Sequence, residues 1–214
     1  MRTIMVMNAK GGSGKSTIAT NLASHYAAEE DANVVLEDFD PQGSSSEWLA
    51  ARPEDRPEII GIRAWEGSAR APRSADVVII DSPSGVRGKE LTDMVRRAET
   101  ILIPVLPSPI DMRAAAHFIH DLLLVGKVSR KQTRVAVIAN RVREHTLVYH
   151  DLEAFLKALK IPFIATLRDT QNYIRAAERG LGIFELAPSL VYPDLEQWDP
   201  LLKWLRSKRS QPQA

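Results

Sequence analysis

The sequence predicts an α/β fold in which helices cover both faces of a single, doubly wound, mostly parallel sheet of about seven or eight strands. Two observations carry this prediction. Short and nearly continuous apolar runs recur along the chain, as in strands that are buried on both faces. Helical patterns lie between most of these runs, and this alternation is typical of parallel sheets.

Strands are expected at the apolar runs, and helices where apolar residues recur three or four positions apart. The first run ends at a glycine-rich turn, and the helical pattern after it carries Ile18, Leu22 and Tyr26 on one face. The segment 52–73 is rich in proline, arginine and glutamate and is expected to be mostly loop. The expected strands span 3–8, 34–36, 59–62, 77–80, 101–106, 135–139 and 161–167, and the expected helices span 16–28, 89–98, 112–125, 147–159 and 169–179.

Length and composition fit one folded domain. The chain has 214 residues, of which 44% are hydrophobic and 26% are charged. We expect the domain to span 1–207 and a basic tail at 208–214 to be frayed. The absence of cysteine excludes a disulfide scaffold, a cysteine zinc site, an iron–sulfur cluster and a thiol nucleophile. No apolar run approaches the roughly 18 residues that span a bilayer, and the apolar start is too short for a signal peptide, so a cytoplasmic location is expected.

Charge is unevenly distributed along the chain. The first 126 residues hold 13 basic and 18 acidic side chains, whereas residues 127–214 hold 15 basic and 9 acidic ones. A basic second half suggests a polyanionic partner, although a solvated surface explains the same counts.

The strongest motif is the run KGGSGKST at 10–17, between the first expected strand and the first expected helix. This context is typical of a P-loop, whose glycines let backbone amides surround phosphate oxygens at a helix N-terminus. Lys15 is then expected to bridge the β- and γ-phosphates, and Ser16 to offer its hydroxyl to Mg²⁺. The expected phosphate-binding residues are Gly11, Gly12, Ser13, Gly14, Lys15, Ser16 and Thr17.

The motif departs from the common P-loop pattern in two places. Its first glycine is replaced by Ala9, and a second lysine, Lys10, follows. In this respect KGGSGKST resembles the deviant Walker A motif of the ParA/MinD family of ATPases. VLEDFDPQGSSSEW resembles the switch I segment of that family, and VVIIDSPSG its Walker B and switch II segments. LRDTQNYIRAAERGLGIFEL resembles its seventh strand and following helix, so the resemblance covers about residues 2–190.

The resemblance implies a role for individual residues. Lys10 would reach across a dimer interface to the ATP of the partner, and Asp40 would position the attacking water, with Asp38 close to the metal. The plainer alternatives are a solvated loop lysine for Lys10 and turn or cap roles for Asp40 and Asp81. The implied catalytic residues are Lys10, Lys15 and Asp40; the implied Mg²⁺ residues are Ser16, Asp40 and Asp81; and the implied base contacts are Asn140, Arg141 and Pro188.

The resemblance also implies a slow, partner-stimulated ATPase with ATP and Mg²⁺ as cofactors. It would form a homodimer with ATP, bind nucleoid DNA without sequence preference, and act with a ParB-like adaptor on its cargo. That cargo could be a plasmid, a chromosome region or a protein assembly such as a carboxysome, and the sequence does not choose among them. Basic residues that match the DNA-binding region are Arg168, Arg175, Arg179, Lys203 and Arg206.

Two alternatives remain open at this point. In a MinD-like protein, a basic amphipathic helix around Leu201–Leu205 would bind an anionic membrane. Trp198, Leu202 and Leu205 also fit a core-packing stripe, which we favour, so membrane binding is not expected. The second alternative is a P-loop biosynthetic enzyme such as an amidoligase, and Lys10 speaks against it.

Overall fold

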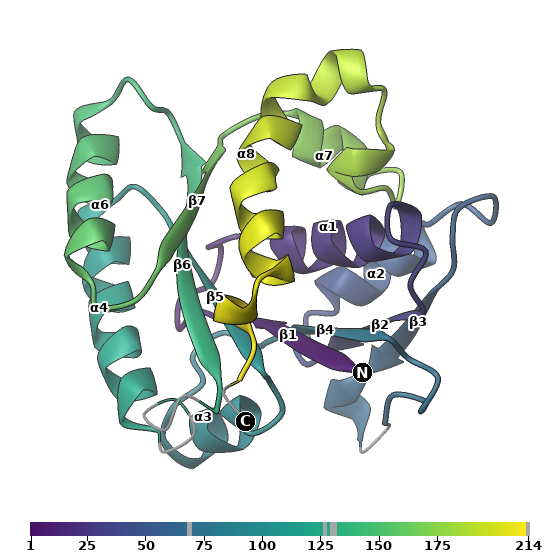
Figure 1. Ribbon diagram of the computed structural model, residues 1–214, viewed down its shortest axis with the longest axis horizontal. Helices are drawn as coiled ribbons and strands as arrows, with labels where there is room; N and C mark the ends of the chain where they lie inside the picture. The colour runs from purple at the N-terminus through teal and green to yellow at the C-terminus, as the bar shows by residue number, and fades with distance from the viewer. Residues whose placement is uncertain (68–69, 126–127, 129–131, 213–214) are drawn as a thin grey trace.

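The computed structural model describes residues 1–67, 70–125, 128 and 132–212 (Figure 1). Within these residues seven strands form one sheet in the spatial order β3-β2-β4-β1-β5-β6-β7. Every neighbouring pair is parallel, so the predicted α/β fold with a parallel sheet is confirmed. The strands are β1 (Arg2–Val6), β2 (Val34–Asp38), β3 (Ile59–Arg63), β4 (Val77–Asp81), β5 (Thr100–Val105), β6 (Arg134–Val142) and β7 (Phe163–Arg168).

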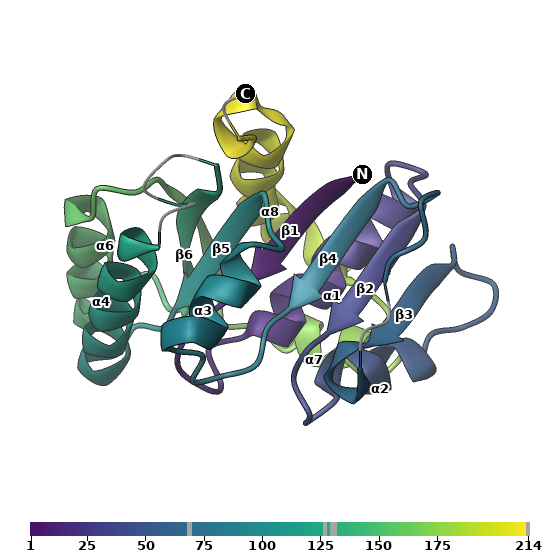
Figure 2. The same cartoon turned by 90° about the horizontal axis from the view of Figure 1, so that it is seen from below.

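Helices cover both faces of the sheet, as the doubly wound prediction requires (Figures 1 and 2). The first face carries α1, α2 and α8, and the second carries α3, α4 and α6. The helices are α1 (Lys15–Ala28), α2 (Ser44–Ala50), α3 (Gly88–Val95), α4 (Pro109–Leu124), α6 (Leu147–Ala158), α7 (Asn172–Ala177) and α8 (Pro188–Arg206), with 3₁₀ turns η1 (Ala64–Glu66), η2 (Ile183–Glu185) and η3 (Lys208–Ser210).

The central strand β1 divides the core into two apolar clusters. The side chains of β1 and of Met7 directly after it alternate, so that Ile4 and Val6 pack under α1 and α8, while Met5 and Met7 pack under α3 and α4. All four side chains are fully buried, which explains why this strand reads as a continuous apolar run. The loop after β1 is therefore held by a rigid base.

Helix α8 belongs to the core. Trp198, Leu201 and Leu205 are fully buried against the first face, as the core-packing interpretation predicts. None of the helices in the described part of the chain is long and apolar enough to cross a membrane.

Three segments differ from expectation. Helix α2 was not expected at all, whereas the loop-rich segment 52–73 holds the strand expected at 59–62 as the edge strand β3, together with the turn η1. Helix α7 covers only six residues of the expected 169–179.

The tail is the third difference. The sequence predicts a frayed tail from residue 208 onward, and this prediction is wrong for residues 208–211. Thr100 donates to the Ser210 carbonyl at 2.6 Å, and Arg134 Nε donates to the Gln211 carbonyl at 3.0 Å. Ser210 is fully buried. Residues 213–214 of the expected tail lie outside the described residues.

Candidate functional site

The candidate site lies at the carboxyl edge of the sheet, where the loops after β1, β2, β4 and β7 meet the end of β6. Open α/β sheets bind ligands at this edge. The loops enclose a cavity of about 540 Å³, which is in the range of small-molecule sites. The cavity is lined by Gly11, Gly12, Gly14, Lys15, Ser16, Thr17, Asp40, Gln42, Ser44, Ser84, Asn140, Arg141, Arg168, Asp169, Thr170, Tyr173 and Ile174.

The P-loop adopts a backbone that only glycine fits at its last turn. Gly14 has φ +90° and begins α1, and a Cβ at this position would collide with the side-chain amide of Asn140. That amide donates to the Ser13 carbonyl at 2.8 Å. Asn140 therefore fastens the P-loop to β6, and Ser13, which is buried, does not line the cavity.

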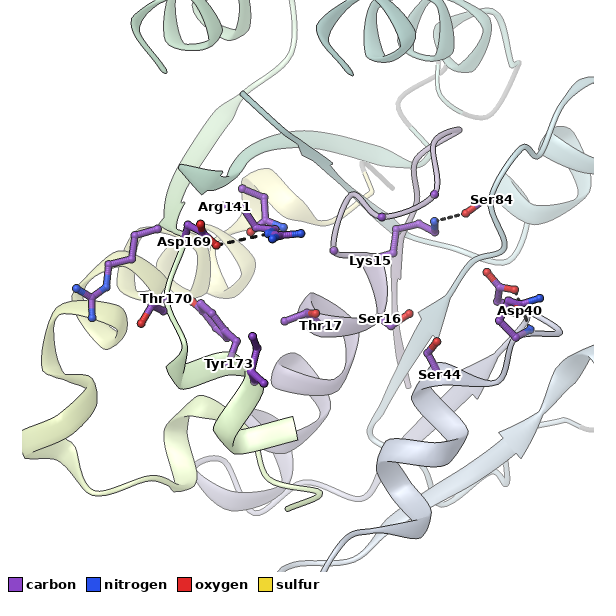
Figure 3. A pocket seen from close by; sticks show the side chains of 17 residues that line it. Lys15, Ser16, Thr17, Asp40, Ser44, Ser84, Arg141, Asp169, Thr170 and Tyr173 are labelled. Carbon is purple, nitrogen blue, oxygen red and sulfur yellow. Dashed lines mark hydrogen bonds and ion pairs between the residues drawn. The ribbon is translucent and has the colours of Figure 1, made fainter. Parts of the chain in front are cut away.

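Lys15 is held in place before any phosphate arrives. Its ammonium donates to Ser84 Oγ at 2.7 Å, and its side chain reaches into the cavity (Figure 3). Burial lowers the pKa of Lys15, while the carboxylates of Asp81 and Asp40 raise it in opposition. The arrangement presents one partly desolvated cation to the cavity.

Lys10 lies outside its own cavity. Its ammonium pairs with Asp111 Oδ1 at 2.8 Å, and Ser108 Oγ donates to the other oxygen of Asp111 at 2.6 Å. The Lys10 side chain keeps 38% of its surface exposed, against 10% for Asp111. Lys10 is thus available at the surface beside the P-loop rather than turned into the site of its own chain.

The residues around Asp81 fit a magnesium ion. Asp81 is fully buried, and its Oδ2 accepts a hydrogen bond of 2.5 Å from Ser45 Oγ. Its Oδ1 has no hydrogen-bond partner among the described residues; burial raises the pKa of this carboxyl, and the side chain of Ser16 opposes that rise. A buried carboxylate oxygen without a partner next to a P-loop hydroxyl is what a water-coordinated Mg²⁺ requires.

The two switch I aspartates play different parts. Asp38 is buried and uses both oxygens on the segment itself, because it accepts from the Asp40 amide at 3.1 Å and from the amide and hydroxyl of Ser46 at 2.9 and 3.1 Å. Asp40 is half-buried and lines the cavity. Asp38 therefore shapes the turn, whereas Asp40 faces the cavity.

We predict that Asp81→Asn stabilises the protein without ligands. Burial raises the pKa of Asp81 to about 6, so at pH 8 the folded protein holds the Asp81 carboxylate as a buried charge, which is unfavourable. Removing it is expected to raise the free energy of unfolding by about 2–3 kcal/mol at pH 8.

The gain should shrink as the pH falls through 6, because the folded wild-type protein then takes up the proton, and it should vanish below about pH 4, where both states are protonated. Urea unfolding at several pH values, without nucleotide or magnesium, measures this difference. A constant gain at every pH would contradict the buried charge.

One side of the cavity combines Arg141, which the sequence analysis expected at the base, with residues that it did not identify. Arg141, at φ +52°, lines the cavity and approaches Asp169 Oδ1 at 3.6 Å. Asp169, Thr170 and Tyr173 follow β7 and lie on the same side of the P-loop (Figure 3). Pro188 is exposed at the start of α8 and does not line the cavity, so its expected base contact is not supported.

The expected DNA-binding residues fall into two groups. Three of them are already paired within the chain: Arg168 with Asp194 at 2.5 Å, Lys203 with Asp199 at 2.5 Å and Arg206 with Glu30 at 3.0 Å. Arg175 and Arg179 are exposed, and no ion pair within the described residues involves them. Arg168 also lines the cavity, so the structure places it against Asp194 at the candidate site, and its expected DNA contact stays a prediction.

The missed residues share one signal. Ser84 follows β4, and Asp169 and Thr170 follow β7, so each lies within three residues of the end of a parallel strand. The rule that places ligands at these strand ends points to them without any motif. Ser45 carries no such signal, because its role depends on Asp81 thirty-six positions away.

Comparison with known proteins agrees with the geometry. The chain is 33% identical over 190 residues to maintenance of carboxysome distribution protein A of Gloeobacter kilaueensis, covering 86% of this chain and 84% of the relative. The protein of the same name from Halothiobacillus neapolitanus is 25% identical over 86% of this chain and 87% of its own length. The solved structure of apo McdA from Cyanthece superimposes with a TM-score of 0.75 at 17% identity, covering 96% of this chain and 99% of that one.

The match to a family extends over most of the molecule. Residues 4–183 match the nucleotide-binding domain described as CobQ/CobB/MinD/ParA. This range contains the P-loop, both switch aspartates and Asp81, and it ends in η2. The resemblance to ParA and MinD proteins is therefore confirmed, and the chain belongs to the CobQ/CobB/MinD/ParA family of nucleotide-binding domains.

Proposed function

We propose that the protein is a ParA-type ATPase that hydrolyses ATP slowly, dimerises in the ATP state, binds DNA without sequence preference and positions a cargo. The observation that carries this proposal is the cavity itself. It brings the P-loop, Lys15 and Asp40 together, while Lys10 stays outside with an exposed side chain. A site with one inward and one outward lysine suits two molecules that face each other.

Within one chain, each residue has a separable task. The P-loop amides and Lys15 bind the phosphates, and Ser16 and Asp81 hold Mg²⁺, which neutralises phosphate charge when bound. Asp40 orients the attacking water, and Arg141 packs beside the base.

The dimer completes the site. Lys10 leaves Asp111 and places its ammonium against the phosphates of the partner chain, where charge develops during hydrolysis. Two copies then enclose two nucleotides. Hydrolysis is slow on its own, and an adaptor bound to the cargo stimulates it.

Arg175 and Arg179 on and after α7 form the proposed DNA-binding patch. Both are exposed and form no ion pair within the described residues, so their charge is available to phosphates. Dimerisation brings two such patches together, which couples ATP binding to DNA affinity. The proposed location is therefore the nucleoid.

The proposed cargo is a protein assembly of the carboxysome class, positioned through a ParB-like adaptor. Its support is the relative at 33% identity, whose name states that it maintains carboxysome distribution. A MinD-like membrane role is less well supported, because the apolar residues of α8 are packed in the core.

The test is co-sedimentation of the protein with plasmid DNA and with anionic vesicles in ATP, ADP or no nucleotide. We expect retention on DNA only with ATP, and loss of it as salt rises. Arg175→Ala should weaken DNA affinity about fivefold to tenfold, because a dimer loses two phosphate contacts. Dimerisation in ATP should be unchanged.

Lys157→Ala is the matched control, since it removes one exposed positive charge from α6, on the other side of the molecule from α7 (Figure 1). DNA affinity equal to that of Arg175→Ala would show that only net charge matters. Retention on vesicles but not on DNA would overturn the proposed function in favour of a membrane-associated one.

A further inference from the structure

Ser45 makes the shortest contact to the buried carboxylate of the site. Its hydroxyl donates to Asp81 Oδ2 at 2.5 Å, and both residues are completely buried. The other oxygen of Asp81 has no hydrogen-bond partner in the described part of the chain. Within the described residues, switch I thus holds one oxygen of this carboxylate and leaves the other without a partner.

The position of Ser45 is itself fixed at both ends of α2. At the start of the helix, the amide and hydroxyl of Ser46 bind Asp38. At its end, Trp48 Nε1 donates to the Leu181 carbonyl at 3.1 Å. Because α2 is held independently of Asp81, Ser45 orients the carboxylate rather than following it.

The end of α2 is anchored further by a buried ion pair. Arg52 makes two hydrogen bonds of 2.9 and 2.8 Å to Glu185, and a third residue, Ser24, donates to the same carboxylate at 2.7 Å. Both charged side chains are almost fully buried. The hydroxyl of Ser45 therefore projects from a helix that cannot easily shift.

The orientation of Asp81 matters because a cation lies close by. The charge of Lys15 acts on Asp81, yet Lys15 donates to Ser84 and makes no ion pair with Asp81 within the described residues. A carboxylate that turned onto Lys15 would neutralise the cation and give up its place beside the metal. Ser45 holds the carboxylate away from this competing contact.

We propose that Ser45 is a positioning residue for Mg²⁺: its hydroxyl keeps Asp81 turned so that the free oxygen Oδ1 serves a metal-bound water and Lys15 stays available to phosphate. This inference rests on the proposed function, since it concerns the same Mg·ATP site. It adds a link between switch I and the strand-end carboxylate that the motif pattern does not contain.

The experiment measures the affinity of the full-length protein for a fluorescent, non-hydrolysable ATP analogue with Mg²⁺ and with EDTA. The magnesium coupling is the dissociation constant in EDTA divided by the dissociation constant with Mg²⁺. Ser45→Ala is expected to lower this ratio roughly tenfold, as outer-shell substitutions do at metal sites, and to change affinity in EDTA less than about twofold. Ser45→Cys nearly keeps the side-chain volume but donates only weakly, so its magnesium coupling should fall between those of the wild type and Ser45→Ala.

Two further variants separate positioning from simple packing. Ser46→Ala removes a hydroxyl from the same helix, but that hydroxyl binds Asp38 and not Asp81. This variant should therefore retain most of the magnesium coupling. In an Asp81→Asn background, Ser45→Ala should have no further effect on the coupling, because the group on which it acts is gone.

The outcomes are distinguishable. If Ser45→Ala keeps the magnesium coupling of the wild type, the inference is overturned and the proposed function still stands. If Ser45→Ala lowers the magnesium coupling as much in the Asp81→Asn background as in the wild type, Ser45 has a structural role and the inference is also overturned. Wild-type protein that binds the analogue equally well with Mg²⁺ and EDTA removes the metal from the proposed function itself.

Discussion

Replacing Lys15 with alanine is expected to weaken ATP binding at least about a hundredfold. The Lys15 ammonium is the inward cation of the cavity, and burial has already removed much of its water. Each charge-assisted hydrogen bond to a phosphate oxygen contributes about 1.5–3 kcal/mol, and about 1.4 kcal/mol corresponds to a factor of ten in affinity. Loss of two such bonds exceeds a factor of one hundred. Equilibrium titration with a fluorescent ATP analogue and Mg²⁺ measures the effect.

Lys10→Ala is the matched control, because it removes the same charge from the same loop. Lys10 lies outside its own cavity and pairs with Asp111, so the affinity of a single chain for ATP should stay within about threefold of wild type. Thermal unfolding checks that both variants are folded. If Lys15→Ala binds ATP nearly as well as Lys10→Ala, Lys15 does not contact phosphate and the assigned site is wrong.

The fold could be predicted because its signals are local. Each expected strand is a short apolar run, and β1 shows the physical reason: Ile4 and Met5 are both buried, on opposite faces, so no polar residue interrupts the run. Helix α2 was missed for the opposite reason. Its serine-rich start has weak helix propensity, and the helix is held by tertiary contacts, those of Ser46 to Asp38 and of Trp48 to the Leu181 carbonyl.

The site could be predicted where residues lie together in sequence and not where the partner is distant. The P-loop motif fixed the positions of Lys15 and Ser16, and both line the cavity. Arg168 was assigned to DNA because nothing near it in sequence shows that Asp194 holds it through two hydrogen bonds. An exposed arginine and a paired one look identical in a sequence, so the charge pattern alone could not separate Arg168 from Arg175.

Asp40→Ala is expected to reduce ATP hydrolysis at least about a hundredfold and to make ATP-bound dimers accumulate. The carboxylate lines the cavity, and a group that orients or accepts a proton from the attacking water contributes about 10²–10⁴-fold. It does not hold the phosphates, so ATP affinity should stay within about threefold. Phosphate release measures turnover, and size-exclusion chromatography with light scattering measures dimerisation in ATP and in ADP.

Two variants make this result specific. Asp40 Oδ1 also accepts from the Gln42 amide at 3.0 Å, so its loss could disturb the turn as well as the chemistry. Asp40→Asn keeps an acceptor oxygen for that amide, and it should still trap the dimer if the carboxylate acts on water. Adding Lys10→Ala to Asp40→Ala should return the protein to a single chain in ATP, because the cation that crosses to the partner is gone. A monomeric Asp40→Ala protein in ATP, or one that hydrolyses ATP at the wild-type rate, would remove Asp40 from its assigned role and with it the link between turnover and dimer lifetime.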